Sequence, residues 1–420
     1  MKKHNFAFRT KREVMRTYHI ILANAKVRNG NRGCVALTLT AMYLVRSLIK
    51  DSGNEVCFYL PDSEDKEMGR HRVRVLDEEI EYVACGYPVP LSYKGYLARL
   101  FRASSTWRDC KIFRSADLIL DIGQGDSFTD IYGPNRFNII DRIHRTARFF
   151  GKPYCLLPQT IGPFRDKKMK QKACKSIERA VLTMARDKQS LQFIHDHVGQ
   201  DVPVTEVIDV AFFMPYKKQT FCEDNVHVGL NVSALLWHGG YNKNNQFGLT
   251  VDYPALVTHI IDFFLSQPRV IVHLVPHVVN AERMIENDYA VCYDLCERYA
   301  SERLVLAPFF LSPVDAKNYI SGLDFFMGAR MHSTIAAFSS GVAVLPMAYS
   351  RKFGGLFADT LRYHNVADMT KASIDEVMQM TKECFARRQE LRTEITDIIS
   401  TRAKAYLDTF NAEIRRILQI

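Results

Sequence analysis

Cationic and titratable side chains follow several apolar runs of strand length in this chain. The sharpest example is the segment 327–334, Met-Gly-Ala-Arg-Met-His-Ser-Thr, which places Arg330 and His332 between a predicted strand and a predicted helix over 333–339. Backbone N–H groups at a helix N-terminus attract anions, and a guanidinium adds two parallel hydrogen bonds to a carboxylate or phosphate. An imidazole beside it can carry a proton near neutral pH. The segment therefore predicts an anion site that includes an acid–base group.

Two further strand ends carry cations. Lys352 lies in the glycine-containing segment 349–355, and Arg186 directly follows another apolar run. An isolated cation of this kind is usually structural, but three such strand ends in one α/β protein favour a single pocket for a small polyanion. Asp126 and Asp187 also follow strands, and each is a candidate for a general base or for a residue that orients the arginines.

Two histidines lie four residues apart around a strand end near the middle of the second half. They lack the Glu or Cys companions that a zinc site would show, so no metal site is predicted. We expect His277 to face a cleft and His273 to point into the sheet as a hydrogen-bonded core residue.

Short apolar runs alternate with helical segments along most of the chain, in two successive blocks. Strands are predicted at 18–23, 56–60, 80–84, 117–122, 153–157, 181–185 and 204–208, then at 227–232, 270–275, 304–306, 325–327 and 342–345, with helices at 34–50, 253–265 and 280–298 among others. This alternation predicts an α/β fold with two Rossmann-like domains that face each other across a cleft. Ligands in such folds bind at the carboxyl ends of the strands.

The expected domain boundaries follow from the same pattern. Residues 1–210 form the N-terminal domain, residues 211–372 form the C-terminal domain, and a hinge lies near 209–223. Residues 373–420 form a helical region that packs on the domains, because a capping box opens this region and apolar residues then keep a three-four spacing.

Composition narrows the class of protein. The chain has 420 residues, of which 47% are hydrophobic and 24% charged, which suits a folded protein with more than one core. No stretch approaches the ~18 uninterrupted apolar residues of a membrane span, and the basic, polar first 16 residues are unlike a secretory signal. The ten cysteines are scattered without a CxxC pair, which is typical of a reducing compartment. These patterns favour a cytoplasmic protein.

The formal net charge of +10 requires an explanation. Basic residues concentrate in the first 16 positions and in the stretch 99–114, where they are mixed with Leu, Phe and Trp. This mixture suits peripheral attachment to an anionic membrane surface, and a solvated basic face over an ordinary core explains it equally well. The chain has neither GxGxxG nor a P-loop, so dinucleotide and ATP binding find little support, and no nucleic acid is expected as a partner.

Several of these segments together resemble the polysaccharide pyruvyl transferase family. The matching segments are 157–164 (Leu-Pro-Gln-Thr-Ile-Gly-Pro-Phe), 185–187 (Ala-Arg-Asp), 324–332 (Asp-Phe-Phe-Met-Gly-Ala-Arg-Met-His), 346–352 (Pro-Met-Ala-Tyr-Ser-Arg-Lys) and 31–33 (Asn-Arg-Gly). The resemblance implies a fold similar to type-B glycosyltransferases. It also implies phosphoenolpyruvate as a donor co-substrate without a further cofactor. The implied acceptor is a sugar with two suitably placed hydroxyls, either free or as part of a lipid-linked oligosaccharide.

The resemblance also implies roles for individual residues. Phosphoenolpyruvate would be bound by Arg186, Arg330, His332 and Lys352, and the acceptor side would include Asn31, Gly33, Gly125 and Gln159. His332 is the candidate general acid for the methylene carbon, or else a hydrogen-bond partner of the leaving phosphate, and Asp126 is a candidate base. The chain departs from the family at Cys34, where the loop normally has Asp, and at Gln124, within a run that normally has three glycines.

Two other classes of function fit parts of the sequence. A nucleotide-sugar glycosyltransferase would share the fold, but its donor loop commonly offers a carboxylate to sugar hydroxyls, whereas this chain offers Arg, His and Lys. A non-catalytic basic adaptor on a membrane or nucleic acid would spread its cations over the surface, whereas these cations are expected to converge on one cleft.

Overall fold

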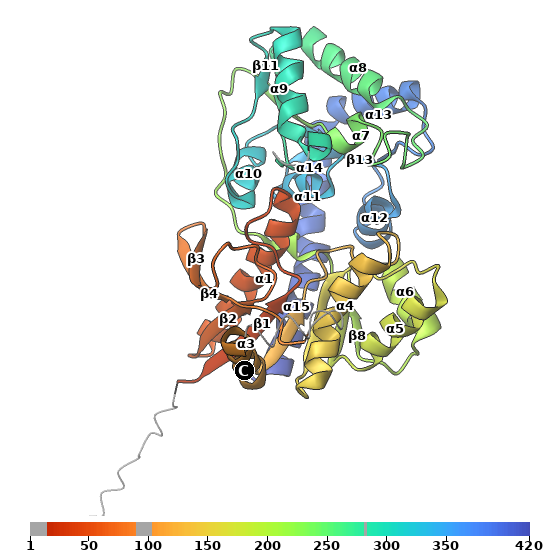
Figure 1. Cartoon of the computed structure of the whole chain (residues 1–420). Helices are drawn as coiled ribbons and strands as arrows, with labels where there is room; N and C mark the ends of the chain where they lie inside the picture. Colours follow the sequence, from red (N-terminus) through yellow and green to blue (C-terminus); the bar gives the residue numbers. More distant parts are fainter. Residues whose placement is uncertain (1–14, 90–102, 281–283) are drawn as a thin grey trace, which may run out of the picture.

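The computed structural model describes residues 15–89, 103–280 and 284–420, and these form two lobes, each built around its own sheet (Figure 1). The strands of the first lobe are β1 (Thr17–Ala23), β2 (Glu55–Leu60), β3 (Gly69–Val75), β4 (Glu78–Ala84), β5 (Leu118–Asp121), β6 (Tyr154–Gln159), β7 (Leu182–Ala185) and β8 (Val204–Glu206). Those of the second are β9 (Val226–Asn231), β10 (Val270–Leu274), β11 (Leu304–Leu306), β12 (Phe325–Gly328), β13 (Ala343–Ala348) and β14 (Ala367–Asp368).

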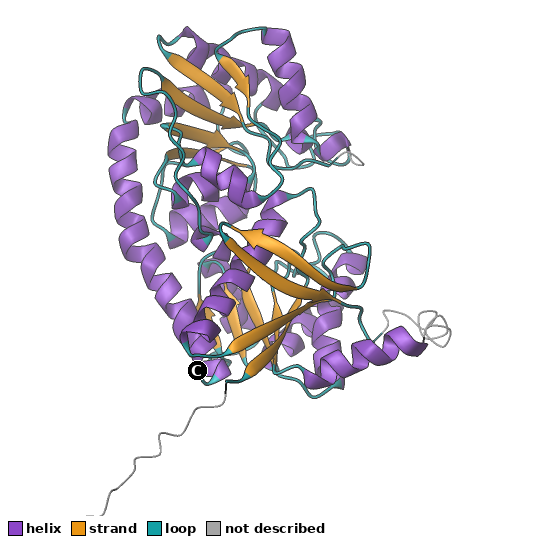
Figure 2. Ribbon diagram, turned by 90° about the vertical axis from the view of Figure 1, so that its left-hand side faces the viewer, coloured by secondary structure: helices purple, strands orange, loops and turns teal. Residues whose placement is uncertain are grey.

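Helices cover the sheets of both lobes (Figures 1 and 2). In the first lobe they are α1 (Arg32–Asp51), α3 (Ala103–Ser115), α4 (Pro134–Phe149), α5 (Lys167–Glu178) and α6 (Lys188–His197). The following part of the chain has η1 (Val210–Phe213), α7 (Ala234–Trp237), α8 (Tyr253–Ser266), η2 (Met284–Glu286), α9 (Asp288–Tyr299), α10 (Pro313–Ile320), α11 (Met331–Ser339), α12 (Arg351–Phe353) and η3 (Gly354–Thr360). The C-terminal run consists of α13 (Ile374–Ala386), α14 (Arg388–Ile398), η4 (Ile399–Ala403) and α15 (Lys404–Leu418).

Both sheets have the strand arrangement of a doubly wound fold. The second sheet runs in the order β11-β10-β9-β12-β13-β14, and every pair in it is parallel. The first runs β3-β4-β2-β1-β5-β6-β7-β8, parallel except for the β3–β4 pair. In each sheet the order reverses beside its first strand, β1 or β9, and ligands of such folds bind where the order reverses. The predicted α/β architecture of two Rossmann-like domains is therefore confirmed.

Strand β3 was absent from the sequence prediction. Its residues Arg70, Arg72 and Arg74 alternate with residues that are only half-buried, and it lies at the edge of the sheet. Because one face of this edge strand is exposed and the other is mostly half-buried, the strand lacks the apolar run by which the other strands were predicted.

The predicted helix over 280–298 was wrong at its N-terminal end. Helix α9 begins at Asp288, and the preceding residue, Asn287, makes no capping hydrogen bond through its side chain. No capping side chain marks the start of the helix, so the helix predicted from apolar spacing extended too far toward the N-terminus. The correction matters, because it brings Asp288 to the first turn of a helix beside the cleft.

The C-terminal helices join the two lobes. Helices α13 and α14 pack on the second domain, and α15 returns to the first, so the run lies along one side of both lobes (Figure 2). Phe410, Ile414 and Leu418 of α15 are buried, and the Tyr18 hydroxyl donates to the Leu418 carbonyl oxygen at 3.3 Å. The chain therefore crosses between the lobes at two places, in residues 207–225 and again near η4.

Helix α1 is long and apolar enough to span a membrane by length and composition alone. It is also mostly buried inside the protein, where it packs on β2, α10, α11 and α15. A buried core helix explains its composition.

Candidate functional site

A cavity of about 1260 Å³ lies between the two domains, at the carboxyl ends of strands from both sheets. The first domain contributes Asn31, Cys34, Gln124, Asp126, Tyr132 and Arg136, and the second contributes His277, Glu286, Arg330, His332, Tyr349, Arg351 and Lys352, among others. The cations that the sequence singled out at the ends of β12 and β13 thus share one cavity.

Arg330 is held rigidly at the end of β12. Its backbone N–H donates to Asn231 Oδ1 at 2.8 Å, and its guanidinium donates to Asp288 through Nη2 (2.8 Å to Oδ1) and Nε (3.2 Å to Oδ2). Burial alone would lower the pKa of Arg330, but the charge of Asp288 outweighs burial and raises it. Because Nη1 has no hydrogen bond to any described residue, the guanidinium keeps one edge for a ligand.

Asp288 organises this part of the cleft. It is fully buried, and besides Arg330 it accepts hydrogen bonds from the backbone N–H groups of Ala234 (2.9 Å), His277 (3.3 Å) and Val278 (2.9 Å). One carboxylate thus fixes the arginine, the start of α7 and the loop after β10. The sequence analysis missed Asp288, because it lay inside the helix that was predicted to begin eight residues earlier.

His332 lies in the first turn of α11, which Arg330 precedes as the N-cap residue. Its Nε2 is 3.5 Å from Asp209 Oδ2, which is an ion-pair distance without hydrogen-bond geometry. Burial by itself would raise the pKa of Asp209, but His332 and then Arg186 outweigh it and lower it to about 2. Asp209 is therefore ionised at neutral pH, and its negative charge lies next to the His332 ring.

Arg186 lies under the cavity and not in its lining. Its side chain is buried, and it donates from Nη1 to Asp209 Oδ2 at 2.8 Å and from Nη2 to Thr160 Oγ1 at 2.6 Å. Arg186 thus supports His332 through Asp209, which links strand β7 of the first domain to helix α11 of the second.

Lys352 of the second domain forms an ion pair with the first domain across the cleft. Its Nζ lies 3.3 Å from Asp126 Oδ2 of the first domain, and the Tyr132 hydroxyl donates to the same oxygen at 3.1 Å. Burial would raise the pKa of Asp126, but the charges of Lys352 and Arg186 lower it. Asp126 is therefore a carboxylate that could accept a proton but holds none to donate at neutral pH.

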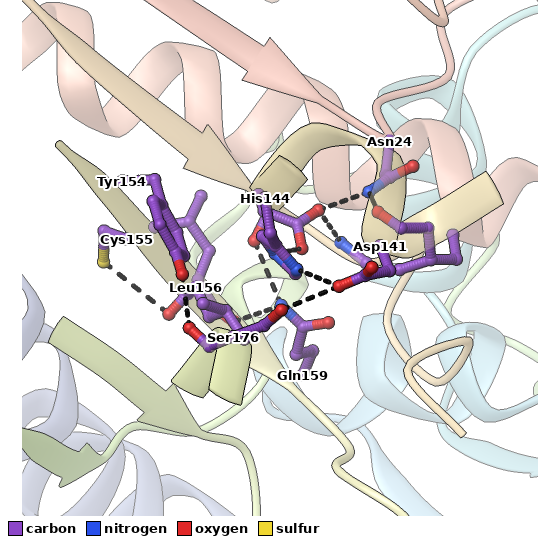
Figure 3. A network of polar contacts seen from close by, with 12 residues as sticks. Asn24, Asp141, His144, Tyr154, Cys155, Leu156, Gln159 and Ser176 are labelled. Carbon is purple, nitrogen blue, oxygen red and sulfur yellow. Dashed lines mark hydrogen bonds and ion pairs between the residues drawn. The ribbon is translucent and has the colours of Figure 1, made fainter. Parts of the chain in front are cut away.

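A buried polar network fixes the loop that carries Asp126 (Figure 3). His144 Nε2 contacts Asp121 Oδ2 at 2.9 Å, and its Nδ1 contacts Asp141 Oδ1 at 3.3 Å. Asp121 Oδ1 in turn accepts from the Gly123 backbone N–H at 3.0 Å. Burial would lower the pKa of His144, but hydrogen bonds to the two carboxylates raise it to about 9.

Gln159 and Gly125 support the same loop from inside the first domain. Gln159 is fully buried and donates to the Asp121 carbonyl oxygen at 3.1 Å. Gly125 has φ +85°, and a Cβ there would lie 2.9 Å from Leu37 and 3.1 Å from Arg186 Nη1. Only glycine fits this position without strain, so both residues shape the site without lining it.

The N-terminus of α1 meets the second domain across the cleft. Asn31 caps the helix by accepting from the Gly33 N–H at 3.0 Å. The Arg32 N–H donates to the His277 carbonyl oxygen at 3.2 Å, and the Val279 N–H donates to that of Gly30 at 2.9 Å. We call these two backbone bonds the interdomain ladder. A Cβ on Gly33 would lie 2.3 Å from His332 Nδ1, so a glycine at this position lets α1 approach the histidine.

Cys34 occupies the next position of α1 and lines the cavity. Burial raises the pKa of its thiol to about 12, and the charge of Asp126 adds to this effect. The residue is therefore neutral where a carboxylate would stand in the resemblance. No group of three or more His, Cys, Asp or Glu side chains within the described residues could hold a metal ion.

The structure brings together five of the predicted site residues in the cavity lining: Asn31, Asp126, Arg330, His332 and Lys352. Arg186, Gly33, Gly125 and Gln159 lie just behind that lining. His273 is in the core as predicted, with its ring between His227 (2.9 Å) and the Tyr319 hydroxyl (2.6 Å). Two further arginines line the cavity, Arg136 and Arg351. The sequence analysis gave no role to Arg351, although it lies in the segment 346–352 directly before Lys352, and Arg136 has no local pattern beyond its charge.

Comparison with solved structures identifies the fold of this chain. HepE from Anabaena, in complex with UDP and glucose, superposes with a TM-score of 0.58 at 13% identity, covering 96% of this chain and 99% of that one. Sucrose-phosphate synthase from Thermosynechococcus elongatus superposes with a TM-score of 0.60 at 9% identity, covering 97% and 100%. The fold is that of the two-domain, type-B glycosyltransferases.

The family is narrower than the fold. The family model described as polysaccharide pyruvyl transferase matches residues 35–351, which is most of the chain. The chain therefore belongs to the polysaccharide pyruvyl transferase family, as the resemblance indicated, and is a transferase of polysaccharide biosynthesis. A search of curated proteins finds no match.

Proposed function

We propose that this protein transfers pyruvate from phosphoenolpyruvate onto two hydroxyls of a sugar, as a cyclic ketal, during assembly of a capsular or other surface glycan. The observation that carries the proposal is the convergence of Arg330, His332 and Lys352 on one interdomain cavity. Phosphoenolpyruvate has two anionic groups, and fixed cations are the groups that bind such a ligand. Arg186 contributes charge from beneath the cavity and holds Asp209.

The reaction needs an acid at the methylene carbon. Protonation there forms the methyl group and leaves positive charge at the carbon that bears the phosphate. A sugar hydroxyl then attacks this carbon, the C–O bond to phosphate breaks, and a second hydroxyl closes the ring. His332 is the natural proton donor because imidazole is a common general acid, whereas Arg330 cannot donate a proton at neutral pH and Asp126 is ionised. The alternative role for His332 is a hydrogen bond that neutralises the leaving phosphate.

The structural neighbours favour a second candidate, a nucleotide-sugar glycosyltransferase, since the HepE structure holds UDP. Calorimetry distinguishes the two. We expect phosphoenolpyruvate to bind more tightly than UDP- or GDP-sugars, both alone and with a sugar acceptor present in case binding is ordered. Binding of a nucleotide-sugar without any phosphoenolpyruvate signal would overturn the pyruvyl assignment.

Turnover gives a direct test. The enzyme is incubated with phosphoenolpyruvate and a panel of p-nitrophenyl hexosides and lipid-linked oligosaccharides whose ring hydroxyls differ in configuration. Phosphate release and a product mass that corresponds to a pyruvate ketal are expected with at least one acceptor. Phosphate release without a ketal product would indicate hydrolysis instead.

We further propose that the enzyme works in the cytoplasm at an anionic membrane surface. Most of the basic N-terminal stretch (residues 1–14) and the start of the stretch 99–114 (residues 99–102) lie outside the described residues. Within α3, Trp107 is 63% exposed beside the exposed Arg108 and Lys111, and Lys111 Nζ lies 4.2 Å from the Trp107 ring centroid. Such a mixed basic and aromatic face suits a membrane interface.

Flotation with anionic vesicles tests this surface, and it should show binding that weakens as the salt concentration rises. Equal binding by the triple variant Arg108→Glu, Lys111→Glu and Arg114→Glu would reject this surface.

A further inference from the structure

His277 is a buried histidine of the cavity wall whose ring has no partner. Its side chain is only 3% exposed, and neither Nδ1 nor Nε2 forms a hydrogen bond with any described residue. Buried polar groups are nearly always hydrogen-bonded, and leaving one unpaired costs about 1–3 kcal/mol. Here two such atoms occur on one ring beside a cavity, so the ring is arranged for a partner that comes from outside the protein.

The backbone around His277 is fixed on both sides. Its N–H donates to Asp288, and its carbonyl oxygen accepts from the Arg32 N–H in the interdomain ladder. These two bonds fix the backbone at His277, one to the second domain and one to the first, so the position from which the ring projects is set on both sides.

The surroundings keep the ring neutral. Burial lowers the pKa of His277 well below its usual range, and the positive charges of His332, Arg330 and Arg32 lower it further. The carboxylate of Asp288 faces the backbone N–H of His277 and is itself paired with Arg330. A neutral imidazole has one N–H donor and one nitrogen lone pair, and so it needs one ligand acceptor and one ligand donor.

Phosphoenolpyruvate can satisfy only half of this requirement. Its carboxylate and phosphate are acceptors, so they can pair with the N–H but not with the lone pair. The acceptor sugar supplies hydroxyl groups, which are donors. A ring that bridges the two substrates would have both of its nitrogens satisfied.

We propose that His277 is a catalytic residue that hydrogen-bonds the bound donor through its N–H and takes the proton from the attacking sugar hydroxyl through its other nitrogen. The inference rests on the proposed ketal transfer. As the hydroxyl oxygen forms its bond to the ketal carbon, its O–H bond breaks and the proton passes to His277. Phosphate then leaves and takes this proton away as hydrogen phosphate. The second hydroxyl closes the ring, and its proton restores the acid that protonated the methylene carbon.

The test compares His277→Asn and His277→Ala with the unaltered enzyme, using the same hexoside panel. We expect phosphate release to fall by about 100- to 10,000-fold, the range for loss of a general base, and phosphoenolpyruvate affinity to change by less than about tenfold. Added imidazole should restore at least about tenfold of the lost rate in His277→Ala, because the truncated side chain leaves space beside the cavity.

His273→Gln is the matched control, since His273 is another buried histidine four residues away whose ring is already paired in the core. We expect it to lower the melting temperature and leave the turnover of the folded protein unchanged. Turnover by His277→Asn within about threefold of the unaltered enzyme, or a loss in His277→Ala that imidazole does not restore, would overturn the base assignment alone. An unaltered enzyme that releases no phosphate from phosphoenolpyruvate would overturn the proposed function and this assignment together.

Discussion

At the scale of single residues, the contact between Gly33 and His332 links the two domains at the site. Gly33→Ala would place a Cβ 2.3 Å from His332 Nδ1, which is closer than atoms can approach, so the imidazole must move. We expect turnover to fall by about 100-fold, because a displacement of about 1 Å at a reacting group has an effect of this size. Gly354→Ala is the control, since an added Cβ there meets nothing within 4 Å, and it should leave steady-state phosphate release unchanged.

His332→Gln separates binding from proton transfer. Glutamine keeps some hydrogen-bonding capacity but cannot act as an acid near neutral pH. If His332 protonates the methylene carbon, phosphoenolpyruvate should still bind while turnover falls by about two to four decades. The variant should also lose incorporation of solvent deuterium into the pyruvyl methyl group, measured by mass spectrometry. Near-normal turnover would pass the role of acid to another residue.

The sequence predicted the cavity-lining residues of the second domain better than the residues behind them. Arg330, His332 and Lys352 follow strand ends, which gives them a local signature that a reader of the sequence can find. Asp209 also follows a predicted strand, but it was assigned to the hinge and not to the site. Asp288 has no such signature, because its importance comes from a contact with Arg330, far away in the chain. Charge partners of this kind become visible only when the fold brings distant parts of the chain together.

At the scale of the elements, the His144 network makes the stability of the first domain depend on pH. The pKa of His144 is about 9 in the folded state, and about 6.5 is the ordinary value of the unfolded chain. Stability from this group is therefore fully present below pH 6.5, and it is lost as the pH rises through 9. The loss should be on the order of 3 kcal/mol.

The measurement is the free energy of unfolding as a function of pH, for the unaltered protein and for His144→Gln. Burial lowers the pKa of Lys317 to about 7, so this lysine acts in the opposite direction over much of the same range. The difference between the two proteins isolates the histidine, since both contain Lys317. A difference that stays constant from pH 6 to pH 10 would contradict the assignment.

Elements were predicted from the sequence where burial imposes a period, and missed where it does not. The central strands, such as β1 and β12, are buried along nearly their whole length and were found within one residue or so. Strand β3 and the two-residue β14 lie at sheet edges, where little burial is needed to hold a strand. The start of α9 was misplaced because no capping side chain marks it.

At the scale of the whole molecule, α15 is expected to hold the first domain together. Ile414 is fully buried in this helix, and Ile414→Ala should lower the free energy of unfolding by about 2–5 kcal/mol. Leu311→Ala is the control, since Leu311 is 80% exposed, and it should change stability by less than about 0.5 kcal/mol. Denaturant unfolding followed by circular dichroism measures both. An Ile414→Ala protein as stable as the control would show that α15 is dispensable for the first domain.

The return of α15 to the first domain also has a consequence for how the protein is made. Translation proceeds from the N-terminus, so the ribosome completes the first sheet long before it reaches α15, with all of the second domain in between. During that interval, the apolar surface that Phe410, Ile414 and Leu418 later cover is exposed on the nascent chain. The first domain can thus become fully native only after the second has been synthesised. A chaperone that shields this surface during translation would raise the yield of active enzyme, and a premature stop before residue 404 would leave a nascent product prone to aggregation.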